Sequence, residues 1–465
     1  MDDTIAAIST PLGEGGIGII RLSGKEAVSI ANRMFVTPTG KTAARLASHS
    51  ITYGYIKDGQ DILDEVLLSV MLAPNSFTKE DVVEINCHGG LIPLRRVLDA
   101  AIKNGARLAS PGEFTLRAFL NGRIDLTQAE AVCDIIQART QESAAVALQQ
   151  LSGGLSQRLS AISQELIGIC AHVEAYIDFP EEDIELSTHD DILNQLQTLQ
   201  DTLKTLSGTY DRGRFLREGL SIAIAGKPNV GKSSLLNSLM ERDRAIVTPT
   251  PGTTRDTIEE YINVKGIPVR IIDTAGIRTA DDLAEREGVN RSIMAIEAAN
   301  IVLIVFDGTQ HSLTHEDTSV INRTTNKTVI AIINKADQKV LLSDKDVKDA
   351  LLHPLKERVY AGTVTLSAKT GQGIEDLKQA IFDLTMKVGF EPKEGILITN
   401  LRHKTAIDNT VSALTQAINC LKDSAPLEIT ALELTTALNY LGEITGTVTA
   451  NDILNKIFED FCIGK

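Results

Sequence analysis

The chain has 465 residues, of which 43% are hydrophobic and 23% are charged. These proportions are ordinary for a globular protein and exclude wholesale disorder, a collagen-like chain and a small disulfide scaffold. No apolar run approaches the ~20 residues of a bilayer span, and no signal segment is evident at the amino terminus. The five cysteines lack CxxC spacing, as is typical of reduced thiols. We therefore expect a multidomain cytoplasmic protein without a membrane contact.

The negative charge is concentrated in one part of the chain. The formal net charge is −15, and residues 121–218 carry 7 basic against 16 acidic side chains, including a dense run at Asp178–Glu185. We interpret this run as a solvated helix end or loop, with acidic ion binding as the alternative. Because the overall field repels polyanions, any contact with nucleic acid needs a local basic patch.

The first 120 residues alternate short β-branched runs with Gly, Pro and Asn, which predicts an α+β domain. The predicted strands are Ile17–Leu22, Ser50–Ile56, Glu65–Leu72 and Asp81–Cys87. Gly13, Gly15 and Gly18 match GxGxxG, but a strand-like run follows them and not a helix, which argues against a dinucleotide site. We expect these glycines to form a tight turn or to allow the close approach of a ligand.

Helical periodicity begins at Leu126 and continues to Ile177, with an interruption expected at Gly153 and Gly154. It returns at Asp191–Leu206, and again after Lys387 through Leu454–Phe461. Between these helical stretches lies a region in which strands and helices alternate. We therefore expect an α/β unit inserted into one discontinuous helical domain.

Residues 219–386 have the βα alternation of a doubly wound, mostly parallel sheet. The predicted strands are Ser221–Ala225, Val269–Asp273, Ile301–Phe306, Val329–Ile333 and Val364–Leu366. The predicted organisation is an α+β domain (1–120), a helical domain in two parts (121–218 and 387–465) and an inserted P-loop α/β domain (219–386). The fold class is thus multidomain, α+β and α/β.

A phosphate-binding motif follows the first strand of the α/β unit. Residues 226–233 read Gly-Lys-Pro-Asn-Val-Gly-Lys-Ser, which fits GxxxxGK[ST] between a strand and a helix. Its glycines let backbone N–H groups surround phosphates, and the helix N-terminus adds positive charge. We expect Lys232 to reach the β and γ phosphates and the Ser233 hydroxyl to ligate Mg²⁺.

Three further motifs indicate that the nucleotide is GTP. Asp273–Gly276 follows a strand, where Asp273 would hold a Mg²⁺-bound water and the Gly276 N–H would sense the γ-phosphate. Asp337 of the NKxD motif offers two acceptor oxygens to the N1–H and amine of guanine, whereas adenine would leave that carboxylate unsatisfied. The Ala368 N–H, within Ser367–Lys369, is the expected donor to guanine O6.

The segment between the P-loop and Asp273 reads as switch I, with Thr253 and Thr254 as candidates for contacting Mg²⁺ and the γ-phosphate. Ile277 stands where Ras-type enzymes carry the glutamine that positions water. Another group must therefore orient the water. The candidates in the following loop are Asp281, Asp282, Glu285 and Arg286.

The whole chain resembles the MnmE (TrmE) tRNA-modifying GTPases. The resemblance rests on Asn229 in the P-loop, on Thr248–Asp256, and on flanking segments. These segments are Asp3–Ala7, Gly15–Gly24, Pro74–Phe77, His88–Gly90, Pro111–Phe114, Ala118–Asn121 and Phe461–Lys465. The family implies a K⁺-stimulated GTPase whose G domains dimerise across the nucleotides.

The resemblance also implies roles for particular residues. It places K⁺ on Asn229, Thr248, Thr250 and Thr253, and Mg²⁺ on Ser233 and Thr254. It selects Glu285 as the water-orienting residue, which makes Glu285 and Lys232 the catalytic candidates. The residues expected to contact GTP are Asn229, Val230, Gly231, Lys232, Ser233, Ser234, Thr248, Thr250, Thr253, Thr254, Asp273, Thr274, Ala275, Gly276, Asn334, Lys335, Asp337, Ser367, Ala368 and Lys369.

For the amino-terminal domain, the resemblance implies a pocket for 5-formyl- or methylene-tetrahydrofolate and a constitutive homodimer. The matching positions are Arg21, Glu84, Arg123 and Lys465. The implied reaction installs a carboxymethylaminomethyl group at C5 of the wobble uridine of certain tRNAs. It is shared with a FAD-dependent partner, MnmG (GidA), in a heterotetramer, and we expect the partner to carry much of the tRNA contact.

Two points stay open at this level. Cys462 is a candidate nucleophile or redox thiol, although no His or Asp is adjacent to it in the sequence and a structural role is favoured. The alternatives to the modifying enzyme are an RNA or ribosome assembly GTPase switch without base chemistry, and a folate-dependent methyltransferase that uses GTP for regulation. A folate pocket would discriminate against the switch.

Overall fold

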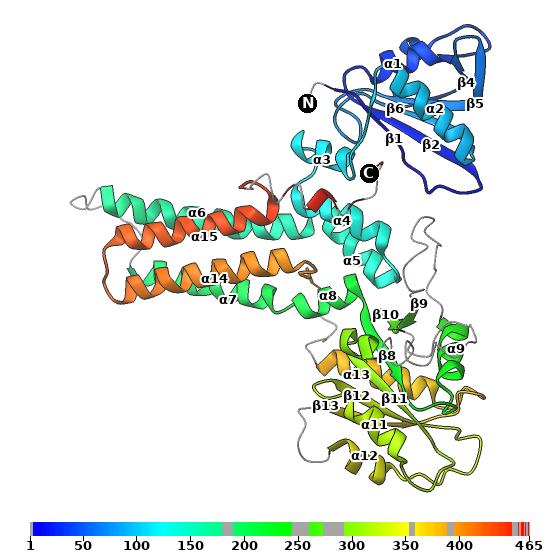
Figure 1. Cartoon of the computed structure of the whole chain (residues 1–465). Coiled ribbons are helices and arrows are strands. Elements are labelled where there is room, and N and C mark those ends of the chain that lie inside the picture. The colour runs from blue at the N-terminus through cyan, green and yellow to red at the C-terminus, as the bar shows by residue number, and fades with distance from the viewer. Residues whose placement is uncertain are drawn as a thin grey trace.

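The computed structural model describes residues 3–178, 189–243, 260–272, 293–352, 359–387 and 395–448, and residues 454, 457–459, 461 and 464. Figure 1 shows three parts, which are an amino-terminal sheet with helices, a long arm of helices, and a second sheet flanked by helices. Among the described helices, none is both long and apolar enough to cross a membrane.

The amino-terminal part is a seven-stranded sheet in the order β3-β4-β5-β6-β2-β1-β7, antiparallel except for the β1–β7 pair. Its strands are β1 (Ile5–Ile8), β2 (Gly15–Ser23), β3 (Phe35–Val36), β4 (Ser50–Asp58), β5 (Asp61–Met71), β6 (Val82–Gly89) and β7 (Arg107–Leu108). Its helices are α1 (Ala27–Met34), η1 (Ala43–Arg45), α2 (Leu91–Lys103) and α3 (Glu113–Leu120). The four strands expected from the sequence are confirmed, whereas β1, β3 and β7 are too short to show alternation.

The arm is built from two separate stretches of chain. Its helices are α4 (Leu126–Gln137), α5 (Gln141–Leu151), α6 (Gly154–Asp178), α7 (His189–Ser207), α8 (Tyr210–Glu218), α14 (Leu401–Lys422) and α15 (Leu427–Thr445). Helix α6 lies beside α15 and α7 beside α14 (Figure 1). One hydrophobic cluster therefore joins side chains from both stretches, such as Leu166 and Leu414.

The expected interruption at Gly153 is confirmed, since Gly153 has a φ of +88° between α5 and α6. A second interruption, between α4 and α5, was not expected. There Thr140 caps the N-terminus of α5, and its side chain and that of Ser143 each accept from the other's backbone N–H. The long periodic stretch is thus three helices.

The inserted part is a six-stranded sheet in the order β13-β12-β11-β8-β10-β9, parallel except for the β9–β10 hairpin. Its strands are β8 (Leu220–Ala225), β9 (Glu260–Val264), β10 (Ile267–Ile272), β11 (Ile301–Asp307), β12 (Thr328–Asn334) and β13 (Val359–Thr365). Its helices are α9 (Lys232–Asp243), α11 (His315–Asn322), α12 (Asp344–Leu352) and α13 (Ile374–Lys387).

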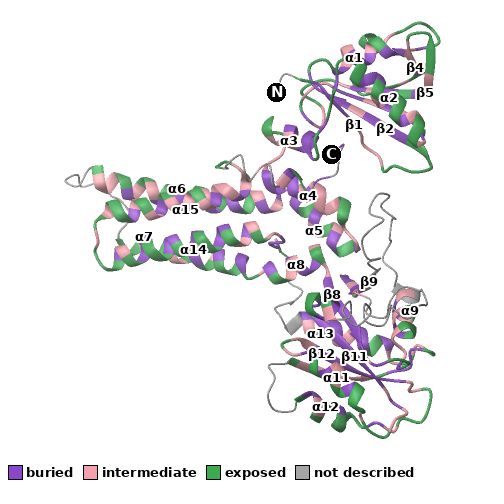
Figure 2. Cartoon of the chain, in the orientation of Figure 1, coloured by how far each residue is buried: buried purple, intermediate pink, exposed green. Residues whose placement is uncertain are grey.

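This sheet confirms the expected mostly parallel architecture. Its central strands are buried on both faces (Figure 2), and apolar clusters fill the space on either side of them. The last strand, β13, begins at Val359, before the expected start at Val364. The sequence did not indicate this first part of the strand, because Gly362 and the register shift beside it interrupt the apolar pattern.

Candidate functional site

The P-loop connects β8 to α9 and uses residues that tolerate unusual backbone angles. Gly226 has a φ of +157°, and a Cβ there would lie 2.6 Å from the carbonyl oxygen of Val305. Gly231 has a φ of +97° and Asn229 a φ of +62°. A non-glycine residue in the left-handed region is uncommon, and asparagine tolerates it better than most. The loop conformation therefore depends on these residue types.

Lys232 opens helix α9, and its ammonium group lies against the loop. Its Nζ donates to the carbonyl oxygens of Gly226 (2.8 Å) and Lys227 (2.9 Å). Ser233 and Ser234 follow it as exposed residues in the first turn of α9. A cation, two hydroxyls and the positive end of a helix dipole therefore meet at one point, an arrangement suited to a phosphate chain and its metal ion.

Asn334, at the end of β12, ties the P-loop to the loop after β13. Its Nδ2 donates to the carbonyl oxygen of Val230 (2.8 Å), and its Oδ1 accepts from the N–H of Ala368 (2.9 Å). A Cβ on Gly231 would lie 2.2 Å from Asn334 Nδ2, so only glycine fits there. Because Asn334 is 3% exposed, both hydrogen bonds of its side-chain amide are shielded from water.

The N–H of Ala368, the expected donor to guanine O6, donates in this structure to the side-chain oxygen of Asn334. The buried amide oxygen of Asn334 is thereby satisfied. The contact with guanine O6 stays a prediction.

Asp337 lies three residues beyond Asn334, fully exposed to solvent, beside the loop after β13. The hydroxyl of Ser367 donates to its Oδ1 at 2.7 Å. This hydrogen bond lowers the pKa of the Asp337 carboxyl, and the charges of Lys369 and Lys335 lower it further. The carboxylate is therefore held ionised, as an acceptor for two N–H groups must be.

Lys335, with a φ of +69°, extends toward Asp307 at the end of β11, and its Nζ lies 2.7 Å from Asp307 Oδ2. Burial alone would raise the pKa of Asp307, but hydrogen bonds from Lys335 and Thr309 lower it. The structure thus brings together the P-loop, Asn334–Asp337 and Ser367–Lys369. Other expected nucleotide residues lie outside the described residues, namely Thr248, Thr250, Thr253, Thr254, Asp273, Thr274, Ala275, Gly276 and the catalytic candidate Glu285.

The amino-terminal candidates form a second constellation. Arg21 on β2 is the register partner of Glu84 on β6, and Arg21 Nε lies 2.8 Å from Glu84 Oε1. The Arg21 guanidinium is 5.7 Å from the ring centres of Phe77 and Phe114. Arg123 is exposed, and its guanidinium is 4.8 Å from the Phe77 ring centre. Sequence reasoning assigned no role to the two phenylalanines.

The carboxyl-terminal end of the chain reaches this constellation. The carbonyl oxygen of Gly464 accepts from Arg21 Nη1 (3.2 Å) and from Ser9 Oγ (3.1 Å). Gly464 has a φ of +93°, and a Cβ there would lie 2.4 Å from the carbonyl oxygen of Ile8. Two further candidates, Cys462 and Lys465, lie outside the described residues on either side of Gly464.

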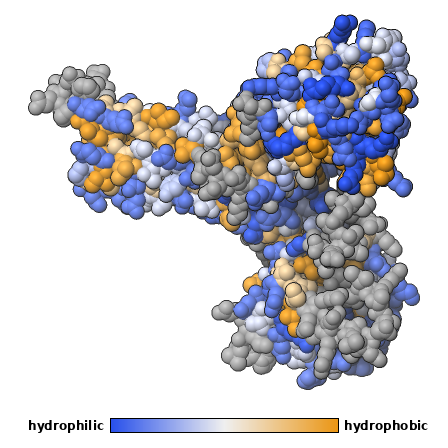
Figure 3. Space-filling view, turned by 45° about the horizontal axis from the view of Figure 1, so that its top comes forward, coloured by the Kyte–Doolittle hydropathy of each residue, from blue (hydrophilic) through white to orange (hydrophobic). Residues whose placement is uncertain are grey.

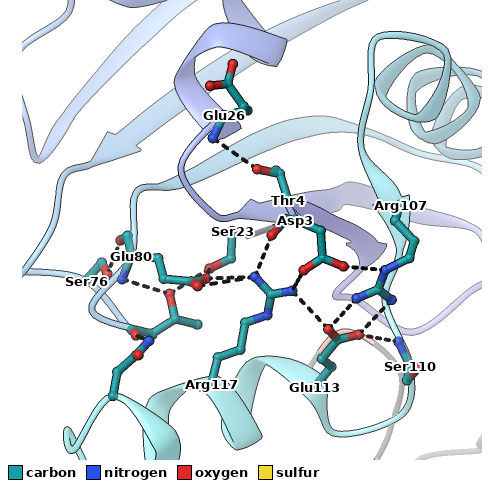
Figure 4. Close-up of polar contacts among 12 residues, drawn as sticks. Asp3, Thr4, Ser23, Glu26, Ser76, Glu80, Arg107, Ser110, Glu113 and Arg117 are labelled. Carbon is teal, nitrogen blue, oxygen red and sulfur yellow. Dashed lines mark hydrogen bonds and ion pairs between the residues drawn. The ribbon is translucent and has the colours of Figure 1, made fainter. Parts of the chain in front are cut away.

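A network around the buried guanidinium of Arg117 fixes helix α3 to the sheet (Figure 4). Arg117 pairs with Asp3 (2.8 Å), Glu113 (3.0 Å) and Glu80 (3.1 Å). Burial opposes ionisation of Glu113, but ion pairs with Arg107 and Arg117 lower its pKa overall. This network supports the region that holds Phe114, and sequence reasoning did not find it.

Of the three glycines that match GxGxxG, Gly18 packs against helix α2, and Gly15 is closely approached by Gly89 of the neighbouring strand. A Cβ on Gly18 would lie 2.5 Å from the Leu94 side chain of α2, and a Cβ on Gly89 would lie 2.4 Å from the carbonyl oxygen of Gly15. The close approach at Gly18 is thus between the sheet and its own helix, whereas Gly13 has open space around it. The expectation of a tight turn or a ligand approach stays a prediction.

Helix α5 of the arm and the connection that precedes it contact the β9–β10 hairpin of the inserted part. The Arg139 guanidinium lies 5.0 Å from the ring centre of Tyr261, and a Cβ on Gly266 would lie 2.7 Å from Glu142 Cδ. Val146 packs against the core of the inserted sheet. The hairpin lies between the predicted switch I segment and Asp273, so the arm contacts the strands that lead into and out of the predicted switches.

A P-loop and the ionised carboxylate of an NKxD motif, both at the carboxyl ends of parallel strands, are typical of a P-loop nucleotide-binding protein of the GTPase class. Residues 126–462 match the MnmE helical domain model, and residues 4–123 match the model of the GTP-binding protein TrmE N-terminus. The chain belongs to the MnmE family of tRNA modification GTPases, which confirms the resemblance indicated by its motifs.

Individual relatives match over their full length. A tRNA modification GTPase MnmE from Acetivibrio thermocellus is 46% identical over 467 residues, covering 100% of this chain and 99% of the relative. That of Alkaliphilus oremlandii is 43% identical over 468 residues, covering 100% of both. Among solved structures, Era of Aquifex aeolicus bound to GDP and AlF4⁻ is 27% identical and covers 42% of this chain and 67% of its own, with a TM-score of 0.27.

Proposed function

We propose that this chain is the K⁺-stimulated GTPase subunit of a tRNA-modifying complex. With a FAD-dependent partner, MnmG (GidA), it would install the carboxymethylaminomethyl group at C5 of the wobble uridine of certain tRNAs. The observation that carries the proposal is the full-length match to tRNA modification GTPases combined with a formed P-loop. We also propose the domain limits 1–120, 121–218, 219–386 and 387–465, with the helical domain in two parts.

At the nucleotide, each described residue has a distinct task. Lys232 would neutralise the β and γ phosphates, and the ionised Asp337 would accept from the guanine edge. Asn334 touches both loops and so would fix the distance between the phosphate site and the base site. Glu285, outside the described residues, is proposed to orient the attacking water.

The residues present fit the two proposed metal ions. Asn229 is exposed on the P-loop in a left-handed conformation, and the Ser233 hydroxyl is exposed at the start of α9. Amide and hydroxyl oxygens are the donors that K⁺ and Mg²⁺ take. We propose Asn229, Thr248, Thr250 and Thr253 as K⁺ ligands, and Ser233 and Thr254 as Mg²⁺ ligands. When bound, the ions supply positive charge beside the phosphates.

The amino-terminal constellation fits 5-formyl- or methylene-tetrahydrofolate. Arg21 contacts only Oε1 of Glu84, which leaves Oε2 without a partner among the described residues and open to the pterin N3–H and amine. Phe77 is half-buried beside Arg21 and offers an aromatic ring, and the fully buried Phe114 supports Arg21 from within the core. Arg123 is exposed beside Phe77, where it would meet the glutamyl carboxylates, and Lys465 is proposed to do the same.

An apolar face supports the proposed homodimer. Ile51, Tyr53 and Leu67 point to the side of the sheet that α1 and α2 leave uncovered, and their relative exposures are 70%, 42% and 44%. Figure 3 shows hydrophobic side chains scattered among hydrophilic ones over the amino-terminal part. We propose this face as the dimer surface, the cytoplasm as the site of action, and tRNA contact largely through the partner.

The test is GTP turnover in matched KCl and NaCl buffers, for the wild type and Glu285→Ala. We expect strong stimulation by K⁺ that is lost in Glu285→Ala without loss of GTP binding. Equal rates in both salts would contradict the proposed K⁺ site and favour an assembly switch. Binding of 5-formyltetrahydrofolate to the full-length dimer separates the two functions further, because a switch needs no folate.

A further inference from the structure

Lys227, the second residue of the P-loop, makes contacts that the phosphate-binding motif does not require. Its side chain is 8% exposed and packs against the connection between β11 and α11. Its Nζ lies 2.9 Å from Asp317 Oδ2, 2.7 Å from Gln310 Oε1 and 3.1 Å from Thr314 Oγ1. An ammonium group with three protons therefore has three oxygen partners, which is a complete set.

Asp317 is held in place independently of Lys227. Its side chain is 4% exposed, and the same Oδ2 atom accepts from the N–H (2.9 Å) and the hydroxyl (2.7 Å) of Thr314. The bond from the Thr314 N–H, together with the bond from the Asp317 N–H to Thr314 Oγ1, forms the capping box at the start of α11. The carboxylate is thus a fixed point, and a buried ion pair to a fixed point restrains the residue that carries the other charge.

The restraint acts on the main chain that holds Lys232. The carbonyl oxygens of Gly226 and Lys227 both accept hydrogen bonds from Lys232 Nζ. Lys227 is therefore tied through its side chain to α11 and through its carbonyl to the phosphate-binding lysine. If its side chain were released, the carbonyl would lose its fixed position and Lys232 its orientation.

We propose that Lys227 is a positioning residue for the GTPase reaction. Its ion pair with Asp317 fixes the two carbonyls that aim Lys232 at the β and γ phosphates. The inference rests on the proposed GTP site. A positioning role can be distinguished from a purely structural one by its effect on ligand binding. A positioning role affects binding of the terminal phosphates and not binding of the base.

The experiment compares GDP with GMP, whose single phosphate lies outside the reach of a lysine that contacts the β and γ phosphates. Full-length Lys227→Met, Lys227→Arg and Asp317→Asn are compared with Lys348→Met, which removes an exposed lysine of α12. Affinities come from displacement of fluorescent GDP, at a temperature where circular dichroism shows each variant folded. GTP hydrolysis is measured in single-turnover mode.

We expect Lys227→Met to lose at least about tenfold in GDP affinity, because a hydrogen bond to a charged group is at stake, with a parallel loss in the hydrolysis rate. GMP affinity should change less than about twofold. Lys227→Arg should restore most of the GDP affinity, since arginine also pairs with a carboxylate. Lys348→Met should match the wild type.

If Lys227→Met does not fold, Asp317→Asn carries the same prediction, because the amide keeps the size of the side chain and removes its charge. Equal losses for GDP and GMP, or no loss for either, would overturn the positioning role. A wild type that binds GMP and GDP equally weakly would instead overturn the proposed GTP site itself.

Discussion

The two candidate ligand sites differ in how the chain assembles them. The described part of the nucleotide site consists of short contiguous motifs, each placed at the end of a strand of one mostly parallel sheet. The amino-terminal constellation collects single residues from β2 and β6, from loops, and from the end of the chain, so that Arg21 meets Gly464 across 443 positions. The residues of a site of the first kind can be recognised from short segments of the sequence. A site of the second kind exists only once the tertiary structure has formed.

The difference predicts different kinds of sensitivity. In the nucleotide site, one sheet edge positions the described loops, so a substitution other than one at the bridging Asn334 should affect one ligand group and leave the others in place. In the amino-terminal site, the members support one another through Arg21, so distant substitutions should weaken the same ligand. Variants in each site, assayed for both ligands, measure how separate the sites are.

The largest effect is expected for Asp337→Asn. An amide can accept only one of the two guanine N–H groups, so GTP affinity should fall by at least about 100-fold. Xanthosine triphosphate should regain affinity, since its carbonyl at C2 can accept from the new amide. Nucleotide titration measures both effects. Folate affinity should not change, and a fall would mean that the two sites are coupled in the absence of nucleotide.

A smaller effect is expected for Glu84→Gln. It removes the charge that pairs with Arg21 and the acceptor proposed for the pterin, so folate affinity should fall by about tenfold. Isothermal titration of 5-formyltetrahydrofolate is the measurement, with exposed Glu26→Gln as the matched control. Unchanged folate affinity would remove Glu84 from the site, and reduced GDP affinity would argue against separate sites.

Gly464→Ala should lower folate affinity less than Glu84→Gln does, although Gly464 lies far from Arg21 in the sequence. A methyl group there would lie 2.4 Å from the carbonyl oxygen of Ile8, in a residue whose φ of +93° disfavours any side chain. The chain end should detach from Arg21, and folate affinity should fall about threefold. Gly168→Ala, in an open position on α6, is the control. Equal behaviour of the two variants would show that docking of the chain end is irrelevant to the pocket.

The smallest effect concerns pH and Ser367→Ala. The hydroxyl of Ser367 stabilises the ionised form of Asp337 and lowers its pKa. GDP binding requires that ionised form, so it should persist at mildly acidic pH and be lost as pH falls through the lowered pKa. Without the hydroxyl the pKa rises, and the acidic limb of GDP binding should move to higher pH by less than about one unit. A shift to lower pH would contradict the assignment.

The sequence allowed the longer strands of both sheets, the helical arm and the motifs of the nucleotide loops to be predicted, because strand alternation, helical periodicity and glycine-rich motifs are local patterns. Helices α1–α3 and the short strands β1, β3 and β7 were not predicted. The contact made by the Ala368 N–H could not be predicted, since it depends on whether a buried Asn334 or a ligand claims it. Arg117 was missed because a charged residue in a sequence indicates exposure, and its 1% exposure results from three acidic partners that fold around it. Phe77 and Phe114 lie in segments that indicated the family, but their residue type did not indicate a role in ligand binding.

The discontinuous arm has a consequence for synthesis of the protein. Leu159, Leu166 and Leu196 leave the ribosome early, yet their buried partners on α14 and α15 follow the whole inserted part. The nascent chain must therefore hold an apolar half-core open while the inserted sheet is translated and folds. Slow translation through the inserted part would prolong the exposure of these apolar side chains, so aggregation during synthesis should depend on how fast residues 219–386 are translated.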